Sequence, residues 1–465
     1  MMNTTSDGQP GDVAISLLAA CLLILCFVTG GDSATANAGG TAAQLLALPL
    51  IVLALFQCFG RDRFQPAVVR WGVVAAAAIL VLSLIQLAPL PDMLWSLPAE
   101  RTALLQDLEA VGVTTVDQRW TLSPSATERS LLFLLPGLAL FLCMLALGRD
   151  GWRRMLCLVV ALCLANLVFA VVQMAAGKDS SLNLYPDFVP GLSGIFANRN
   201  HQADFLAIGL VLVAVFFLHA WRRMREGTGS GVAVGALLFV ALIFTAILPL
   251  LGSRAGVIVA MLMLVAVLPA SGLLSMRSLR ESRWLQVGAL LAVLVFAIGL
   301  RASLAWMTSD AGDLANEGSR FRISVETLGI GSEHAPLGSG IGTFVAAFQQ
   351  GASEDFLMNA YVNNAHNEYA QWWLEGGVLG VIVMLLALAV LARALFGLLR
   401  MRPGSTARVC GIAAMMGIGV IVLHSTVDYP LRTQALMAVF SVLCGIAVGA
   451  AGTAAAARAQ PARRA

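Results

Sequence analysis

The chain has 465 residues, and 59% of them are hydrophobic while only 12% are charged. Soluble domains carry roughly 25% charged residues, so this composition excludes a soluble protein and indicates a polytopic membrane protein. The formal net charge of +3 is too small to indicate a nucleic-acid partner.

Long apolar segments follow one another along the whole chain. A helix needs roughly 20 apolar residues to cross a bilayer, and it satisfies its backbone hydrogen bonds internally. We therefore predict an all-α polytopic membrane protein in which residues 1–465 form a single transmembrane domain. About twelve transmembrane helices are expected, near residues 13–30, 43–59, 71–90, 130–147, 155–175, 202–220, 232–251, 255–273, 285–302, 371–392, 409–427 and 433–452.

Most basic residues are concentrated in alternate loops. The clusters lie at residues 61–70, 149–154, 222–225, 277–283, 393–408 and 458–464. Because basic residues are enriched on the cytoplasmic side, these loops and both termini are predicted to be cytoplasmic. The long loops 91–129, 176–201 and 303–370 are then predicted on the opposite side, and loop 303–370, before the tenth span, is the longest.

The segment Asn198-Arg199-Asn200 stands at the start of the span near 202–220. A charge at membrane depth is costly, so this polar group is expected to be solvated or to bind a ligand. An asparagine at this position also suits a helix cap, and both interpretations stay open for Asn198 and Asn200. Two interpretations stay open for Asp204, which follows the segment: it holds an arginine in position, or it weakens the case for a phosphate ligand at this cluster.

Arg254 lies in the short turn Ser253-Arg254-Ala255-Gly256 between two apolar spans. A single arginine at a helix end is often an interfacial anchor. Two arginines at helix entrances have a further use, since the planar guanidinium fork suits a diphosphate. Arg199 and Arg254 are therefore candidate ligands of a pyrophosphate, with anchoring as the alternative for Arg254.

The long loop 303–370 carries two patterns. Residues 319–328 are predicted to form a short amphipathic helix, which contains Arg320 and Arg322. The second pattern is a glycine-rich stretch further along the same loop.

This stretch is Pro336-Leu337-Gly338-Ser339-Gly340-Ile341-Gly342. Glycine permits positive φ angles and close backbone approach. Because no Lys-Ser/Thr pair follows, a phosphate loop is less expected than a tight turn that packs the loop onto the bundle.

His366 stands in Ala365-His366-Asn367-Glu368-Tyr369, just before the span near 371–392. A histidine has an unperturbed pKa of about 6.5, which suits removal of a proton from a hydroxyl. A capping or interfacial histidine is the alternative. Further along, His424 and Asp428 are one helical turn apart and are expected to be able to interact; a structural and a functional role both stay open for them.

Taken in order, these motifs resemble the O-antigen ligase and polymerase superfamily of bacterial membrane glycosyltransferases. The resemblance is clearest from about residue 190 to 445 and rests on Phe196-x-Asn198-x-Asn200-x-x-Ala203, Ser253-Arg254-Ala255-Gly256, Pro336-Leu337-Gly338-x-Gly340-x-Gly342, Ala365-His366-Asn367-x-Tyr369 and His424-x-x-x-Asp428-Tyr429.

The resemblance implies transfer of a glycan from an undecaprenyl-pyrophosphate donor to an acceptor hydroxyl, on the periplasmic side of the bacterial inner membrane. The acceptor would be lipid A core for a ligase, or another lipid-linked glycan for an O-antigen or exopolysaccharide polymerase. By similarity His366 would be the general base, and Arg199 and Arg254 would bind the donor pyrophosphate. Neither a metal nor a cofactor is implied. Secondary candidates are Arg320, Arg322, Asn198, Asn200, Asn367, Tyr369, His424 and Asp428.

Two other classes of membrane protein remain as alternatives. A polysaccharide flippase or other transporter would be expected to show repetition between its halves or charged residues deep within its spans. A non-catalytic assembly protein would explain the many spans but not the ordered motifs. The choice between ligase and polymerase, the sugar and the acceptor stay open.

Overall fold

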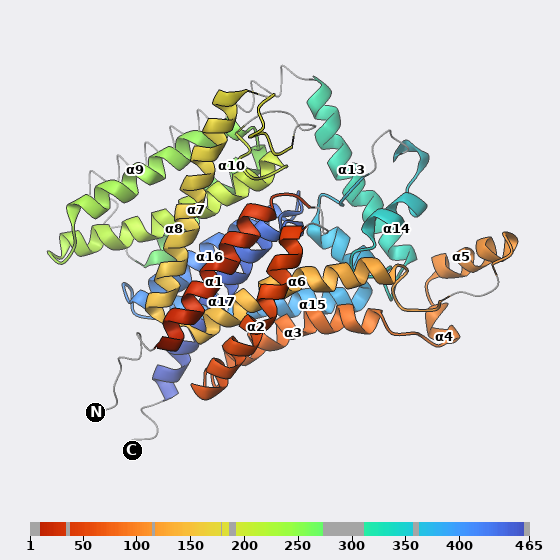
Figure 1. Cartoon of the computed structure of the whole chain (residues 1–465), viewed down its shortest axis with the longest axis horizontal. Helices are drawn as coiled ribbons and strands as arrows, with labels where there is room; N and C mark the ends of the chain where they lie inside the picture. The colour runs from red at the N-terminus through yellow and green to blue at the C-terminus, as the bar shows by residue number, and fades with distance from the viewer. Residues whose placement is uncertain are drawn as a thin grey trace.

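The computed structural model describes residues 10–33, 38–113, 117–177, 179–185, 192–272, 311–356 and 362–459. Helices dominate these ranges (Figure 1), and eleven of the described helices are long and apolar enough to cross a membrane. The predicted all-α polytopic fold is therefore confirmed. The predicted span near 285–302 and the start of loop 303–370 lie outside the described residues.

The membrane-length helices correspond to the predicted spans, but their ends differ. Polar residues extend several of them, because an N-cap and the intrahelical hydrogen bonds continue beyond the apolar stretch. These helices are α1 (Pro10–Thr29), α2 (Ala38–Gly60), α3 (Ala67–Gln86), α6 (Pro124–Ala146), α7 (Arg149–Ala176), α8 (Arg199–Arg225), α9 (Gly231–Ile247, followed by the 3-10 turn η1, Leu248–Leu251), α10 (Arg254–Ser271), α15 (Glu368–Leu399), α16 (Thr406–His424) and α17 (Gln434–Ala459).

The segments outside the bundle contain shorter or less apolar helices. They are α4 (Asp92–Trp95), α5 (Ala99–Ala110), α13 (Ala311–Glu333), α14 (Phe344–Gly351) and the 3-10 turns η2 (Glu354–Phe356) and η3 (Pro430–Arg432). The short helix predicted at 319–328 is thus part of the longer α13. Figure 1 places α4, α5, α13 and α14 together at one end of the bundle, which we call the site end.

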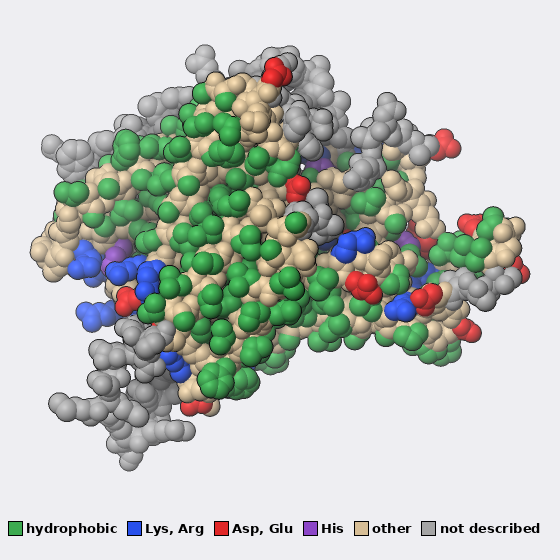
Figure 2. Space-filling view, in the orientation of Figure 1, with side chains coloured by type: hydrophobic (Ala, Val, Ile, Leu, Met, Phe, Trp, Pro, Cys, Tyr) green, Lys and Arg blue, Asp and Glu red, His purple; other side chains and the backbone are tan. Residues whose placement is uncertain are grey.

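The centre of the bundle is formed by α8, α16 and α17, the most buried of the described membrane-length helices. Outer helices such as α9 expose large apolar side chains, and hydrophobic side chains cover most of the lateral surface in Figure 2. Charged side chains gather toward the two ends of that view. At the site end, where α8, α15, α16 and α17 meet, the chain buries a group of polar side chains.

Three helices at the site end begin with side-chain caps. The Asn198 side chain accepts a hydrogen bond from the Asn200 backbone N–H (2.9 Å), and Ser253 Oγ accepts one from Gly256 (3.2 Å). The Asn367 side chain accepts from Tyr369 (3.0 Å) and Ala370 (3.2 Å). The capping interpretation is thus confirmed for Asn198, and these caps fix where α8, α10 and α15 begin.

The glycine-rich stretch forms the predicted tight turn against the bundle. Gly338, Gly340 and Gly342 all have positive φ angles, of 78°, 114° and 89°. The backbone N–H groups of Ser339 and Gly340 donate to the carbonyls of Leu374 and Glu375, both at 2.9 Å. The loop before α15 is therefore fastened to the second turn of α15 itself.

Candidate active site

A cavity of about 1540 Å³ lies at the site end and extends into the bundle. Its polar part is lined by side chains that include Arg199, His201, Arg320, His366 and Arg432. Its apolar part runs between α3, α6, α15 and α17, as far as Gly72, Phe141, Leu391 and Val448. One cavity therefore joins a polar chamber to a long apolar channel.

His366 lies in the wall of the polar chamber. Its side chain is 16% exposed, and its Nδ1 is 3.7 Å from Oδ1 of the fully buried Asp428. The ring also contacts the Tyr429 ring edge-on, with centroids 4.9 Å apart. His366 is thus held between a buried carboxylate and an aromatic ring while it reaches the cavity.

Asp428 is shared by two histidines. Nε2 of the buried His201 lies 3.8 Å from the same Oδ1 atom, which also accepts a hydrogen bond from the Tyr429 backbone N–H at 2.9 Å. Burial alone would raise the pKa of Asp428, but the contact with His366 and the charges of the neighbouring histidines hold it well below its ordinary value. The carboxylate is therefore ionised at neutral pH.

His424 and Asp428 interact as expected, through a hydrogen bond from the Asp428 backbone N–H to the His424 carbonyl (3.0 Å) and through their charges, but the His424 ring has another hydrogen-bond partner. His424 Nδ1 makes a short hydrogen bond with Oδ1 of Asp204, and both side chains are buried. The reason is that α16 ends at His424, and the following turn carries Asp428 to His366 and His201. This pair also supplies the role that the sequence left open for Asp204: it joins α8 to the end of α16.

The two predicted pyrophosphate ligands lie near each other but differ in exposure to the cavity. Arg199 lines the cavity, and its guanidinium lies against Gly252, where an added methyl group would be 3.6 Å from Nη1. Arg254 begins the next helix, α10, two residues later. Its Nε and Nη2 atoms are enclosed by protein, and it does not line the cavity. The geometry therefore favours Arg199 over Arg254 as a ligand.

The two arginines of α13 face different directions. Arg320 lines the cavity, whereas the Arg322 guanidinium lies over the Phe356 ring, 5.5 Å from its centroid. Residues two apart on a helix differ by about 200° in direction, so only one of the pair is able to face the chamber.

Most of the other secondary candidates cap helices or join one helix to another. The Tyr369 hydroxyl donates to the Val422 carbonyl at 2.7 Å and so fastens α15 to α16. Asn367 caps α15, and Asn200 is buried in the first turn of α8. Asn198 both caps α8 and lines the cavity, where it contacts Tyr429.

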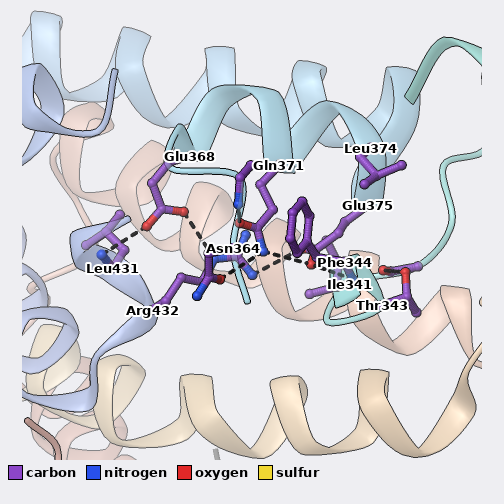
Figure 3. Close-up of polar contacts among 12 residues, drawn as sticks. Ile341, Thr343, Phe344, Asn364, Glu368, Gln371, Leu374, Glu375, Leu431 and Arg432 are labelled. Carbon is purple, nitrogen blue, oxygen red and sulfur yellow. Dashed lines mark hydrogen bonds and ion pairs between the residues drawn. The ribbon is translucent and has the colours of Figure 1, made fainter. Parts of the chain in front are cut away.

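Sequence reasoning missed a second polar group in the cavity wall. Arg432 bridges Glu368 and Glu375, and Figure 3 shows the three side chains meeting beside the first two turns of α15. A usable signal was present: the two glutamates are seven residues apart and therefore share one helix face, and acidic side chains in a membrane helix need a cation.

These features define a polytopic membrane protein with a polar, histidine-containing site at one end of its bundle and an apolar channel beneath it. Residues 239–385 match the family model described as O-antigen ligase, which confirms the resemblance to that superfamily. The matched segment includes Arg254, Arg320 and His366. The match supports a glycosyltransferase-like enzyme of ligase or polymerase type. A search of curated proteins found no match to the chain.

Proposed function

We propose that the protein is a periplasmic-face glycosyltransferase of the bacterial inner membrane that resembles O-antigen ligases. It moves a glycan from an undecaprenyl-pyrophosphate donor to an acceptor hydroxyl. The observation that carries this proposal is that His366, backed by the buried Asp428, shares one cavity with Arg199 and Arg320. The family match at residues 239–385 supports the same type of reaction.

His366 acts as the general base in this proposal. With Nδ1–H directed at Asp428, the Nε2 lone pair takes the proton of the acceptor hydroxyl. The hydroxyl oxygen attacks the anomeric carbon of the donor sugar, and the bond from that carbon to the pyrophosphate oxygen breaks. The Asp428 carboxylate, 3.7 Å from Nδ1, stabilises the imidazolium that forms.

The arginines neutralise the leaving group. Undecaprenyl pyrophosphate departs with negative charge on its phosphate oxygens, which fixed guanidinium groups stabilise without reorganisation. Arg199 at the start of α8 and Arg320 on α13 are the cavity-lining residues for this role. Arg254 supports Arg199 from the adjacent turn. This proposal assigns no step to a metal ion.

The apolar channel supports a lipid-linked substrate. Beyond the polar chamber, the cavity is lined by Leu80, Phe133, Leu138, Phe141 and Leu391, among other apolar side chains. A soluble sugar nucleotide would gain nothing from such a surface, whereas a polyprenyl chain buries apolar area against it.

A polymerase is the second candidate function, and the position of Arg129 favours it. This exposed arginine on α6 lines the cavity beside the apolar channel, on a different helix from Arg199. A polymerase binds two lipid-linked glycans and needs a cation for each pyrophosphate. Incubation of the purified protein with lipid-linked repeat units alone distinguishes the two, because only a polymerase then makes longer chains.

The proposal is tested with purified protein and lipid-linked glycan extracted from the native membrane. His366→Ala should lower the release of undecaprenyl pyrophosphate by at least about two orders of magnitude, as expected for a general base, while donor binding persists. Arg199→Ala should weaken donor binding, and Arg199→Lys should restore it poorly because the planar fork is lost.

His219→Ala is the matched control, since His219 lies on α8 near its Arg222 and Arg223 end, away from the cavity lining. It should leave transfer unchanged. Full transfer by His366→Ala would remove the proposed base. A wild-type protein that moves lipid-linked glycan across vesicles without releasing undecaprenyl pyrophosphate would be a flippase.

A further inference from the structure

One wall of the polar chamber is built around Arg432. Its Nε donates to Glu368 Oε2 and its Nη1 to Glu375 Oε2, each at 3.1 Å. The two carboxylates are 4% and 0% exposed, whereas the Arg432 side chain is 20% exposed and lines the cavity. The two glutamates are therefore more deeply buried than the arginine that they hold, and Figure 3 shows their contacts with it.

The carboxylates already have further partners. Glu368 Oε1 accepts a hydrogen bond from the Leu431 backbone N–H at 3.0 Å. Glu375 Oε1 accepts one from Gln371 Nε2 at 3.2 Å and one from the Phe344 backbone N–H at 3.3 Å. A guanidinium has five N–H donors, and the described residues use two of those of Arg432. The remaining donors are available to a ligand.

The charge of this wall selects the kind of ligand. The two carboxylates offset the charge of the guanidinium, so this wall attracts a pyrophosphate less strongly than an arginine without such neighbours would. Its N–H donors suit a neutral group that offers hydroxyl oxygens. Other arginines that line the cavity, Arg199 and Arg320 among them, belong to α8 and α13. The guanidinium held by two carboxylates and these other guanidinium groups therefore lie on different elements of the chamber wall.

Trp372 completes the wall with an apolar surface. It lines the cavity near the start of α15, between Glu368 and Glu375. A methyl group built on Gly376 or Gly380 would lie 3.4 Å from Trp372 Cε3, so these glycines leave room for the indole to lie along the helix. Trp372 thus presents an aromatic surface to the same cavity as the Arg432 donors. A pyranose ring, which has apolar C–H groups and polar hydroxyls, is able to use both kinds of surface.

The wall also adjoins the proposed base. Glu368 follows His366 by two residues, and Arg432 follows Asp428 by four. At the start of α8, His201 and Asn198 contact Asp428 and Tyr429, the two residues that also contact His366. A group bound at the wall and a group bound at Arg199 therefore both lie in the cavity that His366 lines.

We propose that Arg432 and Trp372, with Glu368 and Glu375 holding the arginine, bind the terminal neutral sugar of the acceptor and direct its hydroxyl toward His366. This subsite rests on the proposed function, since it assigns the acceptor rather than the donor to this wall.

The first test is kinetic. Trp372→Leu should raise the KM for the acceptor about tenfold, the effect of losing one good contact, with kcat and the KM for the donor changed less than about twofold. Trp372→Phe, which keeps a ring, should restore most of the acceptor affinity. Trp71→Leu, at an exposed position on α3, is the control for loss of a tryptophan and should leave both constants unchanged.

The second test needs no transfer activity, so it separates failure of the subsite from failure of the proposed function. Saturation-transfer NMR on the solubilised protein would use the methyl glycosides of glucose, galactose, mannose and N-acetylglucosamine, with inorganic pyrophosphate as the contrasting probe. At least one glycoside should bind the wild type and Arg199→Ala but not Trp372→Leu. Pyrophosphate should bind Trp372→Leu but not Arg199→Ala.

Three results would overturn the subsite. One is that none of the four glycosides binds the wild-type protein. Another is that glycoside binding is unchanged in Trp372→Leu. The third is that Trp372→Leu raises the KM for the donor instead of the acceptor, which would give this wall to the donor sugar.

Discussion

At the scale of single residues, His366 is unusual in its backbone as well as in its side-chain contacts. Its φ angle is +50°, in the left-handed region that non-glycine residues seldom adopt. Such a conformation persists only where the surroundings enforce it, and here the Asn367 cap and the Asp428 contact do so. The strain places the imidazole in the cavity wall instead of along the axis of α15.

The Asp204–His424 pair belongs to the framework, and a double-mutant cycle tests this. Each single change, Asp204→Ala or His424→Ala, leaves the other buried side chain without its hydrogen-bond partner. Each should cost about 3–5 kcal/mol of stability. The double variant should lose clearly less than the sum of the two. Thermal unfolding in detergent gives the coupling.

The Asp150–Arg153 pair on α7 is the control, because both of its side chains are more than half exposed, and its cycle should show little coupling. If the variants kept full stability but lost transfer, the pair would act in the chemistry instead of the fold.

The sequence was informative about individual site residues and silent about their partners. Polar groups at helix ends in an apolar chain are expected to be solvated or to bind a partner. This expectation made Arg199, His366 and Asp428 identifiable. The contacts between Asp204 and His424, and between Glu375 and Arg432, join residues far apart in the chain. Helix packing sets such contacts, and no local spacing encodes them. Arg254 stands at a helix entrance in the sequence, as Arg199 does. The structure distinguishes the two, because the Arg254 guanidinium is enclosed by protein.

At the scale of elements, the glycine-rich turn sets the position of the loop before α15. A Cβ on Gly340 would lie 2.0 Å from Thr121 Oγ1, and its φ of 114° disfavours any side chain. Gly340→Ala should therefore destabilise the protein by at least about 2 kcal/mol and reduce transfer, because the turn contacts the Glu375 backbone. Thermal unfolding and transfer assays measure the two effects.

Gly329→Ala is the matched substitution in the same loop. Gly329 is an exposed residue of α13 with open space around its Cβ position, so alanine should stabilise the helix by up to about 1 kcal/mol. If both variants behaved alike, the turn would not depend on its glycine conformations.

His334 makes the same region sensitive to acid. Burial and the nearby Arg101 lower its pKa from 6.5 to about 4. As the pH falls below 6.5, the unfolded chain gains a proton that folded His334 does not accept, so stability is lost progressively down to about pH 4. The loss should be about 2 kcal/mol at about pH 5.

Hydrogen exchange of the glycine-rich turn at about pH 7 and about pH 5 measures this effect, because the His334 carbonyl accepts the Gly338 N–H at 2.8 Å. His334→Gln should flatten the pH dependence of stability. An unchanged pH dependence in that variant would assign the acid sensitivity to other groups.

At the scale of the whole molecule, the fold was predictable because hydropathy and length determine a membrane helix almost alone. The position of the cavity was not predictable, because its apolar part lies between α3, α6, α15 and α17, which are separated in sequence, and its polar part adds residues of α8 and α13. The orientation in the membrane is a further prediction of the sequence, from its arginine clusters. Figure 1 agrees with one part of it, since α1 begins and α17 ends at the same end of the bundle.

Cysteine labelling tests the orientation, because the site end must face the periplasm if the donor is to be used there. Cys21 and Cys157, the two exposed native cysteines, are first replaced by alanine. Gln350→Cys, exposed at the site end, should then react with an impermeant maleimide in cells whose outer membrane is permeabilised. Thr228→Cys, exposed in the arginine-flanked turn between α8 and α9, should react only after the inner membrane is lysed. The reverse pattern would put His366 and Arg199 in the cytoplasm, and a periplasmic glycan transfer would then be impossible.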